Sequence, residues 1–157
     1  MGTKIFPEHV VVIAEAGVNH NGDIDTARQM INVAADAGAD FVKFQTFTAA
    51  RLATAVAEKP TYQKATTDEA ESQFNMLKSL ELSRTGHEKL KEHCERCGIG
   101  FLSTPFDERS ADFLVGLGLD RLKIPSGEVT NIPYLKHLGG LGLPILLSTG
   151  MCDLDEV

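Results

Sequence analysis

The chain has 157 residues, of which 43% are hydrophobic and 24% charged, a composition that supports one globular core. Its formal net charge of -7 argues against nucleic acid as a partner, because binding to a phosphate backbone requires a basic surface. The residues before Val10 are too polar for a secretory signal, and no apolar run approaches the ~20 residues that span a bilayer, so we expect a cytoplasmic protein that does not contact membranes.

Five short apolar runs predict buried strands. They are Val10 to Ala14, Phe41 to Gln45, Gly100 to Ser103, Arg121 to Ile124 and Pro144 to Ser148. Strands that are apolar throughout are typical of a parallel sheet covered on both faces. Because helical patterns lie between the strands, the predicted fold class is α/β.

The first helical pattern runs from Ile24 to Ala35, with Asp23 placed to cap its start and Gly38 to end it. Further patterns cover Ser83 to Cys97, Glu108 to Leu117 and Pro133 to Leu138, with Asp107 and Asn131 as candidate N-caps. The connection from Thr46 to Leu82 is much longer than the others and contains a short helix near Glu69 to Leu80. Long connections in compact domains are often functional, and we interpret this one as a lid over the site.

Two patterns on the helix from Ser83 to Cys97 are interpreted as structural. Cys94 and Cys97 have the C-x-x-C spacing of redox and metal sites, but they fall at the helix end, where the helix dipole disfavours a thiolate, so packing is the predicted role. His87 and His93 stand among charged residues and are predicted to lie on a solvated face.

Polar residues gather where each apolar run ends, and in parallel sheets and barrels that edge is where ligands bind. The residues are Glu15, Lys43, Gln45, Ser103, Thr104, Lys123, Ser126, Glu128, Ser148 and Thr149. Asn19 and His20 lie in the loop after the first run, and a turn is the predicted role of that loop.

Strand alternation places Lys43 and Gln45 on the inner face while Val42 and Phe44 pack on helices, and it places Lys123 inward by the same rule. Two ammonium groups in a nearly dry interior need anions. Glu15 and Glu128 could supply them in an internal charge network. The hydroxyl groups at the same edge favour instead a phosphate or carboxylate ligand.

Five motifs, taken together, identify a resemblance that runs over essentially the whole chain. They are Ile13-Ala14-Glu15-Ala16-Gly17-Val18-Asn19-His20-Asn21-Gly22, Val42-Lys43-Phe44-Gln45, Phe101-Leu102-Ser103-Thr104-Pro105-Phe106-Asp107, Lys123-Ile124-Pro125-Ser126-Gly127-Glu128 and Leu147-Ser148-Thr149-Gly150-Met151. The chain resembles the N-acetylneuraminate (sialic acid) synthase family, which includes the legionaminic and pseudaminic acid synthases.

The resemblance implies a TIM (β/α)8-type barrel that condenses phosphoenolpyruvate with N-acetylmannosamine or a related amino sugar, giving a sialic-acid-type nonulosonic acid and phosphate. A divalent metal, manganese or magnesium, would polarise the sugar aldehyde. By resemblance, the phosphoenolpyruvate ligands are Lys43, Thr104, Lys123, Ser126 and Ser148, and the catalytic group consists of Glu15, Gln45 and Glu128. Glu15 would touch the sugar, Glu128 would manage water and protons, and a homodimer is the assembly expected by analogy.

A (β/α)8 barrel needs roughly 250 residues. Residues 1–157 therefore correspond to an N-terminal portion of about five βα units. We expect the later strands, the metal ligands and the C-terminal antifreeze-like domain to lie outside this chain, and the isolated chain to be inactive. Two alternatives stay open: a non-catalytic half-barrel that binds an anion or another chain, and a phosphoenolpyruvate-dependent 3-deoxy-sugar-acid synthase.

Overall fold

The computed structural model describes residues 9–54 and 72–157, which form alternating strands and helices. The strands are β1 (Ile13–Gly17), β2 (Phe41–Thr46), β3 (Gly100–Pro105), β4 (Leu122–Ile124) and β5 (Ile145–Leu147). The helices are α1 (Ile24–Asp36), α2 (Ala49–Leu52), α4 (Gln73–Leu80), α5 (Arg84–Cys97), α6 (Glu108–Gly116) and α7 (Ile132–Gly140), with a 3₁₀ turn, η1, over Ser126–Glu128. The predicted α/β class is confirmed.

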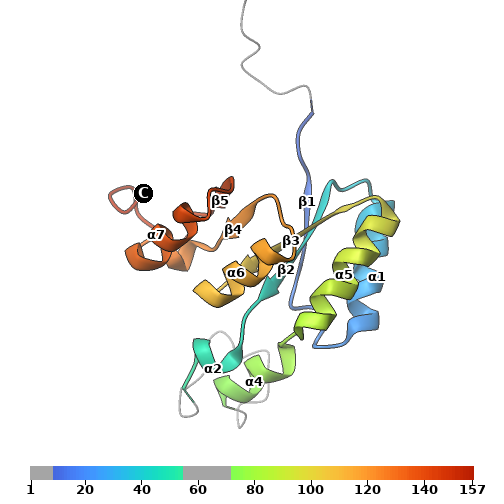
Figure 1. The fold of residues 1–157 in the computed structure, drawn as a ribbon, viewed down its shortest axis with the longest axis horizontal. Helices are drawn as coiled ribbons and strands as arrows, with labels where there is room; N and C mark the ends of the chain where they lie inside the picture. The colour runs from blue at the N-terminus through green and yellow to red at the C-terminus, as the bar shows by residue number, and fades with distance from the viewer. Residues whose placement is uncertain (1–8, 55–71) are drawn as a thin grey trace, which may run out of the picture.

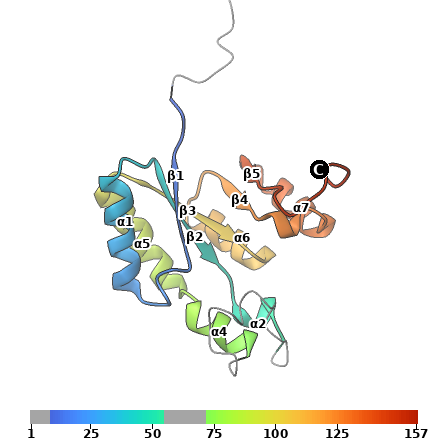
Figure 2. The same ribbon diagram turned by 180° about the vertical axis from the view of Figure 1, so that it is seen from behind.

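All strand pairs are parallel. β2 lies between β1 and β3, β4 pairs with β5, and β3 lies beside β4, so the strands follow one another in sequence order (Figures 1 and 2). The register sets Glu15 opposite Lys43 and Gln45 opposite Thr104. Within the described ranges these strands do not close on themselves, and the complete barrel stays a prediction.

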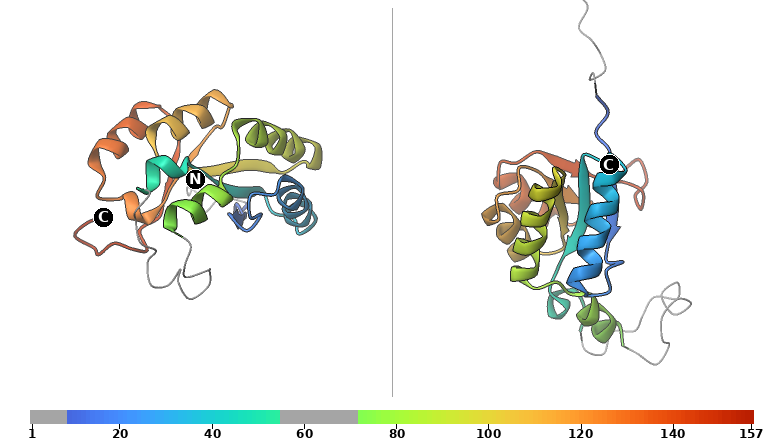
Figure 3. Two further views of the ribbon diagram at one scale, coloured as in Figure 1. Left: turned by 90° about the horizontal axis from the view of Figure 1, so that it is seen from below. Right: turned by 90° about the vertical axis from the view of Figure 1, so that its right-hand side faces the viewer.

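The helices follow an arc outside the strands, in the order α1, α5, α6 and α7 (Figure 3, left). Between the two layers lies one apolar core, in which Phe44, Ile31, Leu90, Leu114 and Leu122 are fully buried. Val42 and Ile124 belong to the same core, as strand alternation predicted. The inner side of the strands is thereby left for Lys43, Gln45 and Lys123.

The predicted helix caps are confirmed. The carboxylate of Asp23 accepts from the Thr26 amide at 2.6 Å, that of Asp107 accepts from the Ser110 amide at 3.1 Å, and the Asn131 side chain accepts from the Tyr134 amide at 3.3 Å. Each bond satisfies a free amide of the first helical turn.

The first strand begins three residues later than predicted. Val10 to Val12 are at least half exposed, because pairing with β2 starts at Ile13, opposite Phe41. Phe41 is the first residue of β2, so the register begins at Ile13, and of the residues before it only the Val12 carbonyl still accepts from the Phe41 amide, at 3.2 Å. The apolar run marks the strand, but the partner strand fixes its start.

The long connection after β2 leads from the strand into α2 and then α4, which pack together beyond the carboxyl ends of the strands (Figure 1). The predicted short helix is confirmed over Gln73–Leu80. Residues 55–71, including the segment from Lys59 to Lys64, lie outside the described residues, and the lid stays a prediction.

Apolar surface is exposed at both edges of the strand array. All three residues of β5 are exposed, and an apolar groove of about 480 Å³ lies beside β1, lined in part by Ala14, Met30 and Val33. Exposed apolar surface of this kind is expected where further elements or another chain would pack. Among the described residues, none of the helices is long and apolar enough to cross a membrane.

Candidate active site

Lys43 stands at the centre of the inner face. Its ammonium group forms an ion pair with the Glu15 carboxylate from β1, and its side chain is largely buried. The Thr104 hydroxyl of β3 lies 3.5 Å from Lys43 Nζ, at the outer limit of a hydrogen bond. Three neighbouring strands therefore each contribute one polar group to one point.

Lys123 adds a second positive charge nearby. Its Nζ donates to the Ile124 carbonyl at 2.7 Å. Burial lowers the pKa of Lys123 below its ordinary value, repulsion from Lys43 lowers it further, and Glu15 opposes both effects. Two lysines thus act on each other beside one carboxylate, an arrangement that favours binding of an additional anion.

Gln45 and Glu15 meet at Gly17, the last residue of β1. A Cβ atom at residue 17 would lie 3.3 Å from Glu15 Oε1 and 3.8 Å from Gln45 Nε2. The absent side chain leaves the carboxylate and the amide facing shared space. A ligand bound beside Lys43 would therefore also reach hydrogen-bonding groups from Glu15 and Gln45.

The residues that follow β4 and β5 lie less tightly together. The Ser148 amide donates to the Ile124 carbonyl at 3.1 Å, which sets Ser148 beside the end of β4, and Ser126 begins the turn η1. Glu128 Oε2 accepts instead from Asn131 Nδ2 at 2.7 Å, and among the described residues it forms no ion pair with either lysine. Glu15 alone fits the proposed internal charge network.

The prediction that His87 lies on a solvated face is wrong. The ring is 1% exposed and lies between the edges of Phe101 and Phe113, with His87 Nε2 2.8 Å from Thr46 Oγ1. The missed signal is helical spacing, since residues 87, 90 and 94 share one face of α5 and Leu90 and Cys94 are both in the core. His93 is partly exposed and bonds to Asn32 at 2.7 Å.

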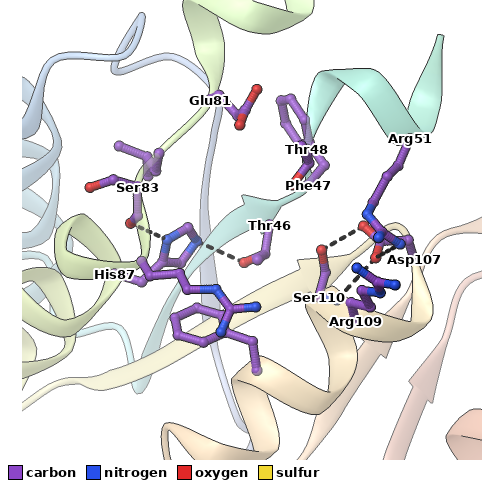
Figure 4. Close-up of a pocket in the computed structure, with 13 residues that line it drawn as sticks. Thr46, Phe47, Thr48, Arg51, Glu81, Ser83, His87, Asp107, Arg109 and Ser110 are labelled. Atoms are coloured by element: carbon purple, nitrogen blue, oxygen red, sulfur yellow. Dashed lines mark hydrogen bonds and ion pairs between the residues drawn. The ribbon is translucent and has the colours of Figure 1, made fainter.

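His87 also lines a cavity of about 280 Å³ on the outer side of β2 and β3 (Figure 4). Arg51, Arg84 and Arg109 line it together with Glu81 and Asp107, so its charges nearly balance. None of the residues predicted to bind phosphoenolpyruvate lines it. The cavity is therefore separate from the inner-face site.

No redox or metal role is supported for the cysteines. Cys94 is buried in the core, and burial raises the pKa of its thiol to about 12, so it stays protonated. Across the described ranges, no group of three or more His, Cys, Asp or Glu side chains could hold a metal ion. The carboxylates at the inner face are also engaged, Glu15 by Lys43 and Glu128 by Asn131. These residues do not fit a metal site by themselves.

Comparison with known proteins shows which family the chain resembles. The chain is 55% identical over 146 residues to N,N'-diacetyllegionaminic acid synthase from Legionella pneumophila and 53% identical over 147 residues to the protein of that name from Campylobacter jejuni. These alignments cover 93% and 94% of this chain but 41% and 44% of the relatives. The chain thus spans about two fifths of their length.

Solved structures give the same result. A sialic acid synthetase from Leptospira borgpetersenii in complex with citrate superposes with a TM-score of 0.79 at 33% identity, covering 94% of this chain and 47% of that one. A truncated 3-deoxy-D-arabino-heptulosonate 7-phosphate synthase from Thermotoga maritima superposes with a TM-score of 0.61 at 14% identity, which is a likeness of fold. The NeuB family model matches residues 30–157. The chain belongs to the NeuB family, and its resemblance to the sialic and legionaminic acid synthases is confirmed.

Proposed function

We propose that this chain supplies the phosphoenolpyruvate side of a nonulosonic acid synthase, an enzyme that joins phosphoenolpyruvate to an N-acetylated hexose and releases phosphate. The observation that carries the proposal is the ion pair between Lys43 and Glu15 on the inner face, with the Thr104 hydroxyl 3.5 Å from Lys43 Nζ. The lowered pKa of Lys123, caused by burial and then by repulsion from Lys43, supports the proposal. Membership of the NeuB family and the similarity to named synthases support it.

In this proposal Lys43 and Lys123 bind the phosphate and carboxylate of phosphoenolpyruvate, together with hydroxyl groups of Thr104, Ser126 and Ser148. Ammonium and hydroxyl donors hold such oxygens through charge-assisted hydrogen bonds. Fixing both anionic ends leaves the enol carbon oriented toward the acceptor, which supplies part of the rate enhancement by positioning alone.

Glu15 and Gln45, which meet at Gly17, would contact the sugar acceptor, and Glu128 would handle protons when the intermediate breaks down. The family implies a divalent metal, which when bound would polarise the sugar aldehyde. No step of the proposal relies on a metal ligand from the described residues. The proposal also includes later strands that complete the (β/α)8 barrel and a C-terminal antifreeze-like domain. It further includes a dimer.

Calorimetry with phosphoenolpyruvate tests the proposal. The Lys43→Met, Lys123→Met double variant keeps the aliphatic stems and removes both charges. Loss of two charge-assisted bonds at about 1.5 kcal/mol each predicts at least a hundredfold loss of affinity. The matched control, Lys89→Ala with Lys136→Ala, removes two exposed lysines and should bind as the parent does.

Equal affinities in the two double variants, both folded by circular dichroism, would overturn the proposal. A second measurement separates the proposal from the alternative of a non-catalytic half-barrel. A full-length synthase that contains this chain should release phosphate from phosphoenolpyruvate when N-acetylmannosamine and manganese are added, whereas a binding module would hold phosphoenolpyruvate unchanged.

A further inference from the structure

A hydrogen-bonded relay of three side chains lies on the outer side of β2 and β3. Ser103 Oγ is 2.6 Å from Thr46 Oγ1, Thr46 Oγ1 is 2.8 Å from His87 Nε2, and His87 Nδ1 is 2.9 Å from the Ser83 carbonyl oxygen. All three side chains are at least 95% buried. Figure 4 shows the histidine ring between Ser83 and Thr46.

The direction of each bond follows from the donors available. The Ser83 carbonyl can only accept, so His87 Nδ1 carries the proton, and burial keeps the ring neutral by lowering the pKa of His87. Nε2 then accepts from the Thr46 hydroxyl. Because the Thr46 hydroxyl donates its one proton to His87, it can only accept from the Ser103 hydroxyl. The chain of donation runs from β3 through β2 to α5.

The relay is adjacent in sequence to the inner-face site. Thr46 follows Gln45 on β2, and Ser103 precedes Thr104 on β3, while Gln45 and Thr104 are register partners. Successive residues of a strand point to opposite faces, so each relay residue and its neighbour sit back to back. A shift of Ser103 or Thr46 on the outer side therefore moves Thr104 or Gln45 on the inner side.

We propose that the Ser103–Thr46–His87 relay positions the phosphoenolpyruvate-binding groups, by fixing the ends of β2 and β3 so that the Thr104 hydroxyl stays directed at Lys43. The inference rests on the proposed function for the identity of the ligand. The relay residues touch neither ligand nor reacting atoms, and they act through Thr104. Fully satisfied buried polar networks specify one geometry, which apolar packing does less sharply.

Thr46→Val is the informative variant, because it keeps the β-branched shape and removes the central hydroxyl. His87 Nε2 and Ser103 then lose their shared partner. Thr46→Ser restores the hydroxyl and is the rescue. Ile31→Val, in the core on α1, is the matched control that lowers stability without altering the relay.

The first readout needs no ligand. Three-bond couplings to the Thr104 methyl carbon report its χ1 rotamer, which we expect to be single in the parent, in Thr46→Ser and in Ile31→Val, and averaged in Thr46→Val. The second readout is phosphoenolpyruvate affinity, which should fall about tenfold in Thr46→Val, the loss of one well-directed bond to a charged group, and recover in Thr46→Ser.

A single Thr104 rotamer in folded Thr46→Val overturns the relay's role, whatever the affinities are. An equal change in Ile31→Val does so as well, because general loss of stability would then explain it. If the parent chain shows the expected rotamers but binds no phosphoenolpyruvate, the proposed function fails while the positioning of Thr104 stands.

Discussion

Gly22 lies where the loop after β1 meets α4, and replacing it with alanine should push α4 away from that loop. The residue has φ +77°, and a Cβ atom there would lie 2.3 Å from the backbone carbonyl oxygen of Ser79. Gly38 has the same φ of +77°, but a Cβ atom at that position would meet nothing within 4 Å, so Gly38→Ala is a matched control.

The two substitutions differ by the close contact alone. Both force an L-residue into the left-handed region, at about 1–2 kcal/mol, and both reduce the freedom of the unfolded chain equally. Gly22→Ala adds overpacking against backbone, which costs about 1–3 kcal/mol. With roughly 2–4 °C of Tm per kcal/mol in a chain of this size, Gly22→Ala should melt several degrees below Gly38→Ala.

Urea denaturation and thermal melts of both variants measure this difference, and limited proteolysis around α4 shows where the loss occurs. We expect faster cleavage near α4 in Gly22→Ala, because α4 must move away from the loop to relieve the contact. Identical midpoints and cleavage patterns in the two variants would refute the reasoning, since the contact with Ser79 would then carry no cost.

Three further predictions concern buried groups. Tyr134→Phe removes a 2.9 Å hydrogen bond to the Pro105 carbonyl and should lower the free energy of unfolding by about 1–3 kcal/mol, measured by urea titration. An unchanged urea midpoint would show that water replaces this hydrogen bond. Burial lowers the pKa values of His20 and His87, so below about pH 6.5 the unfolded state binds more protons than the folded state. The urea midpoint should therefore fall as the pH is lowered from about 7.5 to about 5.5. A midpoint that does not change with pH would contradict neutral, buried rings. Leu90→Ala, at a fully buried position, should cost about 2–5 kcal/mol by the same titration, and a loss below 1 kcal/mol would show that the core refills the space.

Local signals in the sequence were enough to predict much of the fold. Asp23, Asp107 and Asn131 cap helices because a short polar side chain satisfies a free amide wherever a helix begins, and this needs no knowledge of distant residues. Strand alternation likewise predicted the opposite faces of Lys43 and Phe44. The start of β1 could not be predicted this way, because it depends on where β2 begins.

The site was harder to predict at the level of individual contacts. The pairing of Glu15 with Lys43 depends on the register between β1 and β2, which no single strand encodes. Glu128, one of the two carboxylates that could have paired with the lysines, bonds to Asn131, the cap of the next helix. The charged residues beside His87 in the sequence give no sign of its burial, because its neighbours in space are Thr46 and two phenylalanine rings.

The two faces of β2 and β3 are consequently linked. The inner face carries groups whose charges favour an anion, and the outer face carries polar groups that are already satisfied by one another. Because successive residues of a β-strand point to opposite faces, a substitution that repacks the outer face also shifts the side chains on the inner face. Variants of Thr46, Ser103 or His87 should therefore weaken anion binding more than variants of Leu90 or Ile31 that lower stability equally, and this inequality distinguishes positioning from stability in general.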